Sequence, residues 1–505
     1  MASLLERYDK DIVGVLSCYD RVVIHGTLPG IGHSEGMTAY LNAHKIRIFD
    51  YTKFAEPLRD IIRNNAERLA EQNGIAIQFL RKSNIRKESV VERVIAERGD
   101  EPGLVAIVSA MEACNAYKPW HDKQTHRTFL RPDSGKCLHY YFYFIDAKYG
   151  LCYLRVPTWC PFRLQFYYNG HNRLSASLDK AGIDYTLVDN GFVGIDDFEK
   201  AQKLADEFDV RELHRLLDRY ASKFCPVVKE LALSYHWSLM QVEYATDIVF
   251  RSGKCLAPLY ETIVRSAIHS VKPENVATFL GRRLSANFNA QLGNKFNTRI
   301  EGTRIRHQMG PSSIKMYDKF GMILRIETTA NDVSFFRLHR TVEHRDGTSD
   351  FKLAALKKNI YSLSDLRRIL AASNRRYLEF ISCIEDPSVG SKLLDKISRP
   401  VCAQGRNYKG FNFFSNDDLE IMHAIARGEH AITGFRNVDL KRHLRRFSSG
   451  QISRHLKRLR VHGLIKRIGC RYKYYLTKLG RRAVLTGLKL RKLFVIPQLA
   501  APITP

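Results

Sequence analysis

The sequence predicts a multidomain α/β (α+β) protein, with mixed N-terminal domains that contain antiparallel hairpins and an α-rich C-terminal domain. The chain has 505 residues, more than one hydrophobic core usually organises. Hydrophobic residues make up 45% of it and aromatic residues 11%, which is enough apolar surface for several cores. Apolar residues recur at strand spacing in some segments and at helical spacing in others, so we expect both kinds of element.

The first expected domain is a mixed α/β domain over residues 1–135. The β-branched, apolar segment 11–28 predicts one long strand or a hairpin. Helical spacing follows in three segments: 36–46, 54–73 and 86–99. Pro102 and Gly103 then end the helices before an apolar strand, "LVAIVSAM".

The second expected domain covers residues 136–270. Its first part, 137–168, is strand-rich and strongly aromatic, with a turn near 147–150. Helices are expected from 172 to about 269, interrupted by a short strand. In this helical stretch Glu243 and Asp247 lie four residues apart, which favours a solvated helix face over a metal site.

The aromatic strands of this domain allow two interpretations. Residues 140–144 and 166–168, with cations nearby in the sequence, could stack unpaired bases. Aromatic side chains at every second position of a strand are more often part of a core, and we favour the core.

A third domain is expected over residues 271–400. Three short strands between 303 and 329 predict a meander, and helices are expected from about 352 to 384. The Pro- and Gly-containing segment 398–410, "SRPVCAQGRNYKG", is interpreted as a linker to the last domain.

The last domain, 405–505, has the pattern of a helix-turn-helix. Three helices are predicted: one from Asp417, a second over 438–447 and a third over 451–463. The third places Ile452, Leu456 and Leu459 on one face. Two strands around a turn near Gly469 and a final helix from about Leu479 follow.

The segment "HLKRLRVHGLIKRIGCRYKYYLTKLG" resembles the winged-helix domains of MarR-type and ArsR-type regulators. The resemblance covers residues 411–493. It implies that the third helix enters the major groove of DNA while the hairpin, or wing, reaches adjacent phosphates or the minor groove. The whole chain also resembles a family of bacterial proteins of unassigned activity through segments such as "KCLHYYFYFIDAKYG" and "LRIETTANDVSFF".

Charge agrees with a nucleic-acid partner. The chain has 80 Lys plus Arg against 52 Asp plus Glu, a net charge of +28. Residues 411–496 alone hold 20 Lys plus Arg against 5 Asp plus Glu, a net +15. This concentration favours DNA first and RNA second over a membrane surface or a protein partner. The expected contacts, in the third helix and the wing, are Gln451, Ser453, Arg454, Lys457, Arg458, Arg471 and Lys473.

We therefore expect a DNA-binding protein of a bacterial mobile or accessory element. One alternative is a metal-dependent nuclease or DNA strand transferase of the transposase kind, and another is the protein component of a ribonucleoprotein with structured RNA. A ligand-responsive regulator comes after these. The oligomeric state and the DNA or RNA target are left open.

Catalysis on nucleic acid would need carboxylates that hold Mg²⁺. The candidates are Asp20, Glu112, Asp318 and Glu327, which lie in or beside expected strands. The simpler interpretation is that each pairs with a neighbouring Arg or Lys, so whether the protein is an enzyme stays open.

Zinc is not favoured as a cofactor. Five residues within 26 positions, Cys114, His121, His126, Cys137 and His139, could supply ligands, but their spacing matches no zinc finger. The ten cysteines include no Cys-x-x-Cys pair, and the sequence has no export signal and no long apolar run. These features predict a cytoplasmic protein without a membrane span.

Overall fold

The computed structural model describes residues 4–81, 86–271, 273–282, 296–301, 304–385, 388–468, 472–491, 495–496 and 499. The chain forms two compact units, Met1–Glu385 and Asp386–Pro505, here called unit 1 and unit 2. Each unit has a hydrophobic core of its own, so each is described by itself.

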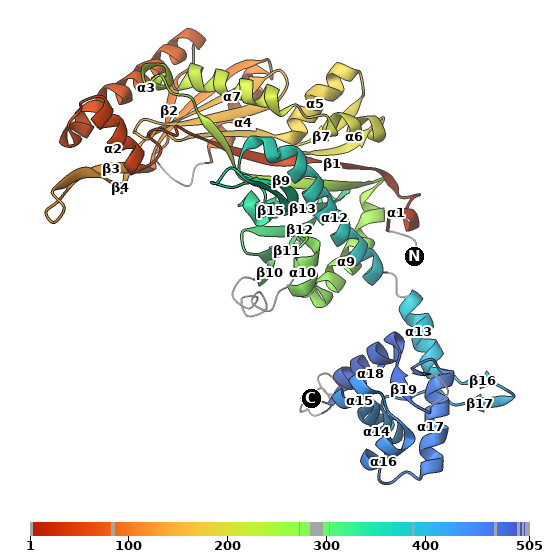
Figure 1. The fold of residues 1–505 in the computed structure, drawn as a ribbon. Coiled ribbons are helices and arrows are strands. Elements are labelled where there is room, and N and C mark those ends of the chain that lie inside the picture. The colour runs from red at the N-terminus through yellow and green to blue at the C-terminus, as the bar shows by residue number, and fades with distance from the viewer. Residues whose placement is uncertain are drawn as a thin grey trace. The chain divides into compact units, whose positions relative to one another are not determined.

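One large mixed sheet is the framework of unit 1 (Figure 1). Its strands are β1 (Ile12–Thr27), β2 (Ile77–Phe79), β3 (Gly103–Asp122), β4 (Arg127–Asp146), β5 (Gly150–Pro157), β6 (Leu164–Asn169), β9 (His236–Phe250), β10 (Phe296–Glu301), β11 (Arg304–Met309), β12 (Ser312–Lys319) and β13 (Ile323–Ala330). The eleven strands follow the order β10-β11-β12-β13-β9-β1-β6-β5-β4-β3-β2. Only β2 and β3 pair in parallel. The mixed α/β class that the sequence predicts is confirmed at this level.

Strands from all three segments expected as separate domains lie in this sheet. The segment 1–135 contributes β1 to β3 and the first part of β4. The segment 136–270 contributes the remainder of β4 with β5, β6 and β9, and 271–400 contributes β10 to β13. The long pairing of β9 with β1 and β13 joins distant parts of the chain into one unit. The division into compact units falls at 385/386.

Helices and small hairpins surround the sheet. The helices are α1 (Leu4–Arg7), α2 (Ser34–Ala43), α3 (Tyr51–Asn73), α4 (Lys87–Arg98), α5 (Gly170–Ala181), α6 (Phe198–Asp206), α7 (Val210–Phe224), α8 (Val227–Glu230), α9 (Gly253–Ser270), α10 (Pro273–Phe279) and α12 (Leu363–Glu385), with 3₁₀ turns at Ile48–Asp50, Val333–Phe335 and Ile360–Ser362. Two hairpins pair β7 (Tyr185–Val188) with β8 (Gly191–Ile195) and β14 (Arg337–Glu343) with β15 (Ser349–Ala355).

The two faces of the sheet are covered differently. On the first face, α2, α3, α7, α9, α10 and α12 pack on one continuous apolar core. On the second face, α4 packs with Tyr141 and Tyr143 over β3 and β4. Elsewhere on that face, α5, α6 and β8 pack around Leu16 of β1. The second face also carries buried polar side chains on β1, β9, β12 and β13, and these form the candidate site of unit 1.

Two expectations within unit 1 were wrong. The stretch 172–269 was expected to be helical, but β9 is a central strand of fifteen residues within it. Residues 352–355 belong to β15, so the helix expected from about 352 begins at Leu363. Of the two alternatives for 11–28, one long strand or a hairpin, the structure has the single strand β1. Residues 140–144 are all buried, as the core interpretation predicts.

Unit 2 contains α13 (Ser388–Ser398), β16 (Val401–Ala403), β17 (Arg406–Tyr408), α14 (Asn416–Ile425), α15 (Gly428–Thr433), α16 (Asn437–His443), α17 (Ser449–Val461), β18 (Ile465–Arg467), β19 (Tyr474–Leu476) and α18 (Lys478–Leu490). The expected linker at 398–410 instead contains the β16–β17 hairpin. Unit 2 is thus mixed rather than all-helical, because β18 and β19 form a second hairpin. Its core includes Ile452, Leu456 and Leu459, the face that helical spacing predicts to be buried.

No helix among the described residues combines the length and the apolar character needed to cross a membrane.

Candidate functional site

Three carboxylates converge on the second face of the sheet in unit 1. Asp20, Glu243 and Glu327 lie on β1, β9 and β13, and each offers an oxygen within 4.8 Å of the others. Asp20 and Glu327 are buried, whereas Glu243 is partly exposed. The three strands are neighbours in the sheet, so one face carries acidic groups from distant parts of the chain.

Strand register explains the convergence. Glu243 pairs with Thr329 of β13 and with Arg21 of β1, while Glu327 pairs with Ala245. The pairing of β1 with β9 shifts between Tyr19 and Arg21, so Asp20 is an extra residue at an irregularity. Such bulges redirect a side chain, and here Asp20 points to the same face as the two glutamates.

Lys315 of β12 lies between the two glutamates. Its Nζ is 3.1 Å from Glu243 Oε1 and 2.5 Å from Glu327 Oε1. The Tyr317 hydroxyl donates to Glu327 Oε2 at 2.8 Å. Burial raises the pKa of Glu327 despite the nearby ammonium. A divalent ion bound by both glutamates would therefore have to displace Lys315.

Asp20 belongs to a second, fully buried part of this network. His171 Nδ1 lies 3.1 Å from Asp20 Oδ1, and the Asn190 amide donates to the same oxygen at 2.6 Å. Arg325 pairs with Asp247 through two hydrogen bonds of 2.6 Å. Burial opposes ionisation of Asp20, but the hydrogen bond from His171 and the nearby Arg325 hold its pKa well below the usual value.

The network has the side chains of a cation-binding site. The same side chains can also pair with one another without a further ion. Four carboxylates, those of Asp20, Glu243, Asp247 and Glu327, meet the cations Lys315 and Arg325 beside His171. Carboxylate oxygens are the ligands that Mg²⁺ prefers, and two or three of them are enough for a phosphoryl-transfer site.

Of the four predicted catalytic residues, the structure brings two together. Asp20 and Glu327 meet, whereas Glu112 and Asp318 lie outside the cluster. Glu112 lies apart on β3, where it accepts hydrogen bonds from Tyr141 and Arg155. Asp318 alternates with Lys315, Tyr317 and Lys319 along β12, and so points to the other side of the strand.

Glu243, Asp247 and His171 join the site without having been predicted in it. The interpretation of Glu243 and Asp247 as a solvated helix face was wrong, since both lie on β9 and Asp247 is buried. A spacing of four residues puts two side chains on one face of a helix and also on one face of a strand. His171 follows Gly170 in the first turn of α5.

The five residues weighed as zinc ligands do not form one ligand set, although Cys137 Sγ lies 3.8 Å from His139 Nδ1. Within the described residues, the metal-compatible groups of three or more His, Cys, Asp or Glu include none of Cys114, His121, His126, Cys137 and His139. His121 Nδ1 lies 2.9 Å from the Thr128 hydroxyl, and His126 is exposed at a turn.

In unit 2, α16 and α17 pack against each other and the β18–β19 hairpin follows directly. Ser448 and Gln451 form a reciprocal capping box at the start of α17. Arg454 and Arg460 of α17 are exposed, and Lys457 is half-buried. With 3.6 residues per turn, Arg454 and Lys457 lie away from the buried Ile452, Leu456 and Leu459, whereas Arg460 lies at the flank of this buried face. Neither Arg454 nor Arg460 makes an ion pair with any residue that the structure describes.

The predicted contact residues of unit 2 have different surroundings. Gln451 and Ser453 are exposed but take part in local bonds, with Ser448 and Asn437 respectively. Arg458 is an exception to the prediction, because it pairs with buried Asp418 at 2.6 Å and donates to backbone carbonyls. It is therefore held by its own unit. Lys473 is half-buried, and Arg471 lies outside the described residues.

Several exposed cations of unit 2 were not among the predicted contacts. They are Arg442, Arg445, Arg460, Lys466 and Arg467, in α16, the turn after it, α17 and β18. The sequence already placed these cations outside the buried apolar positions. The prediction, however, named only residues between 451 and 458 and the wing tip.

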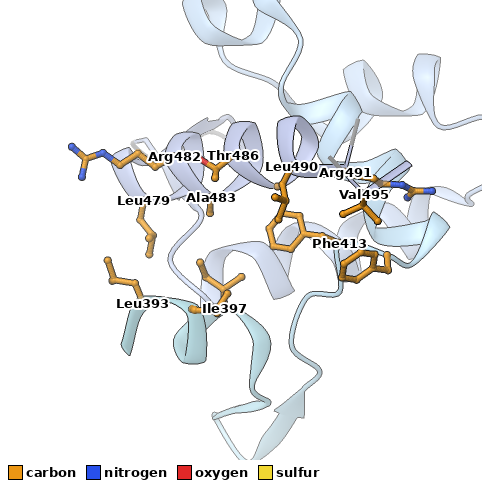
Figure 2. Close-up of a pocket in the computed structure, with 13 residues that line it drawn as sticks. Leu393, Ile397, Phe413, Leu479, Arg482, Ala483, Thr486, Leu490, Arg491 and Val495 are labelled. Atoms are coloured by element: carbon orange, nitrogen blue, oxygen red, sulfur yellow. The ribbon is translucent and has the colours of Figure 1, made fainter. Parts of the chain in front are cut away.

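An apolar pocket of about 490 Å³ lies elsewhere in unit 2. Figure 2 shows Leu393 and Ile397 of α13 opposite Leu479 and Ala483 of α18, with Phe413 beside them. Two arginines lie at its edge. The lining offers no convergent set of groups for catalysis.

Comparison of the chain with known protein families, with functionally described proteins and with solved structures finds no match. The function is therefore inferred from the geometry and charge of these two sites.

Proposed function

We propose that the protein binds nucleic acid, double-stranded DNA in the first place, through a winged-helix arrangement in unit 2. The observation that supports this most is the outward side of α17, where Arg454 and Lys457 lie away from the buried apolar residues and the exposed Arg460 flanks them. A basic helix that follows a helix and a turn, and precedes a hairpin, has the form of a recognition helix with its wing. The net charge of +15 over residues 411–496 favours the phosphate backbone as partner.

The test is the affinity of the full chain for labelled duplex DNA across salt concentrations. If about six cations contact phosphates, affinity should fall about 1,000-fold between roughly 50 and 200 mM salt. Replacing Arg454 and Lys457 together with alanine should weaken binding and lower the salt slope by about two. The control is Arg399→Ala, which removes an exposed cation of unit 2 that is already paired with Asp395.

Two outcomes would count against this proposal. If the double variant binds duplex DNA as tightly as the wild type, α17 is not the contact surface. If the purified protein retains RNA at high salt and binds duplex DNA only weakly, the ribonucleoprotein alternative gains support. A footprint at one DNA sequence would favour a regulator or an element-specific protein.

As a second candidate function we propose metal-dependent phosphoryl transfer in unit 1, a nuclease or strand-transfer activity. The convergence of Asp20, Glu243 and Glu327 supports it. A divalent ion held there would activate water or stabilise charge on a phosphate. Lys315, once separated from the glutamates, would be a cation next to that phosphate.

Incubation of labelled duplex DNA with and without Mg²⁺ tests this candidate. Glu243→Gln should abolish cleavage while leaving the fold intact, because Glu243 is the most exposed of the three carboxylates. Glu101→Gln is the control, since Glu101 is an exposed carboxylate of the same unit outside the cluster. Absence of cleavage by the wild type with Mg²⁺ and Mn²⁺, or cleavage that survives Glu243→Gln, counts against the candidate.

A further inference from the structure

A second group of metal-compatible side chains lies in unit 2, away from the acidic network. Glu429 and His430 belong to α15 and His443 ends α16, and their ligand atoms lie within 4.8 Å of one another. His443 Nε2 is 3.1 Å from Glu429 Oε1, and His430 Nε2 is 4.0 Å from the same oxygen.

The His430 imidazole is an independent indication of a ligand. Its side chain is only 5% exposed, and its Nε2 has no hydrogen-bond partner among the residues that the structure describes. A buried polar nitrogen without a partner costs free energy, so such atoms usually meet water, a ligand or an ion. This nitrogen faces the Glu429 carboxylate, and His430 lines a cavity of about 510 Å³ together with Glu429 and His443.

We propose that Glu429, His430 and His443 form a binding site for a divalent transition-metal ion of the zinc class. Two imidazole nitrogens and one carboxylate oxygen are a donor set that such ions prefer, whereas Mg²⁺ and Ca²⁺ prefer oxygen alone. Ligand atoms around a tetrahedral ion with bonds of about 2.1 Å lie roughly 3.4 Å apart, so modest side-chain movements would close the present spacing.

The residues around the three ligands also fit a bound metal ion. Arg427 Nε donates to Glu429 Oε1 at 2.8 Å and would orient this carboxylate from outside the ligand set. The remaining coordination position would face the cavity, whose wall includes Asp439. The ion would tie α15 to α16, the helix that packs against α17, and so stabilise unit 2.

A small anion is the competing occupant. Arg436, Arg442 and Lys473 also line the cavity. An anion next to His430 Nε2 would however meet the carboxylate of Glu429, which favours a cation at that point. If a metal ion occupies the site, Zn²⁺ raises the unfolding temperature. If an anion occupies it, inorganic phosphate does.

The experiment uses the full chain after removal of metal by a chelator. Zn²⁺ binding is measured by calorimetry, Co²⁺ coordination by its visible absorption, and the unfolding temperature with Zn²⁺ or with inorganic phosphate. We expect Zn²⁺ to raise the unfolding temperature of unit 2 and Co²⁺ to give the bands of a low-coordinate site. His443→Gln should remove one bound ion per chain or weaken it at least about tenfold, and should abolish the Zn²⁺ shift.

His423→Gln is the matched control, because His423 is an exposed histidine of α14 in the same unit. It should bind Zn²⁺ like the wild type. Glu429→Gln provides a second variant of an exposed residue, so a folding defect in one variant does not decide the result. The proposal is overturned if His443→Gln and Glu429→Gln bind as many ions as the wild type with the same affinity, or if phosphate alone raises the unfolding temperature. None of these readouts depends on DNA binding.

Discussion

Two arginines on α17, four residues apart, differ in what surrounds them. The Arg458 side chain is 12% exposed and lies against Asp418, which is 5% exposed. Arg454 is exposed and makes no ion pair within the described residues. Arg458 is thus held by its own unit, whereas the charge of Arg454 is available to a partner.

This difference predicts opposite effects of two alanine substitutions. Arg458→Ala should lower the free energy of unfolding of unit 2 by about 3 kcal/mol, because it leaves a buried carboxylate without its partner. Arg454→Ala should change it by less than about 0.5 kcal/mol. Urea unfolding followed by circular dichroism measures both. Equal stability of the two variants would contradict the assignment.

Glu112 provides a prediction of pH dependence. Burial opposes its ionisation, but hydrogen bonds from Tyr141 and Lys87 hold its pKa below the usual value. Between the lower folded pKa and the unfolded pKa of about 4.3, the folded state therefore binds fewer protons than the unfolded state. The stabilisation that ionised Glu112 provides is fully present above the unfolded pKa. It is lost as the pH falls through the lower folded pKa.

Glu112→Gln should accordingly destabilise unit 1 by about 1–3 kcal/mol at neutral pH. The difference from the wild type should shrink as the pH falls below about 4. Urea unfolding at a series of pH values measures this, with Glu101→Gln as the control at an exposed carboxylate. A difference that stays constant with pH would show that the ion pair is not its source.

At the scale of elements, the start of α5 is pressed against β1. A Cβ at Gly170 would lie 2.0 Å from the backbone oxygen of Tyr19, so only glycine allows this approach. The contact brings His171 next to Asp20. A local packing requirement of one helix thus positions a member of the acidic network.

Gly170→Ala should therefore separate α5 from β1 and destabilise unit 1 by about 2–3 kcal/mol, typical of overpacking. Gly194→Ala is the control, because nothing lies within 4 Å of its Cβ position. Thermal unfolding of both variants measures the effect. The loss of the His171–Asp20 contact should also appear as a rise in the pKa of Asp20 in the Gly170 variant, observable by NMR titration.

At the scale of the whole molecule, two cores belong to two units. Domains with separate cores commonly unfold as separate cooperative transitions. We expect two transitions in calorimetry of the full chain. Arg458→Ala should shift only the one that belongs to unit 2, and Gly170→Ala only the one that belongs to unit 1. A single transition shifted by both variants would mean that the units unfold together.

Much of the local structure was predictable because it depends on short-range pattern. Segment 11–28 is one strand, and the helical positions of Ile452, Leu456 and Leu459 are buried. These features follow from alternation and from helical spacing within a few residues. The strand β9 was not predictable in this way, since the four-residue spacing of Glu243 and Asp247 fits a helix face as well as a strand face.

The sequence by itself determined α14, α16, α17, α18 and the β18–β19 hairpin of unit 2, the concentration of positive charge there, and two of the acidic residues of unit 1. Only the tertiary structure decided that Asp20 and Glu327 meet Glu243, that Arg458 is held by Asp418, and that His430 faces Glu429 and His443. The physical reason is that composition and periodicity act within a few residues, whereas the partner of a charged side chain depends on strand order and on contacts between residues far apart in the chain.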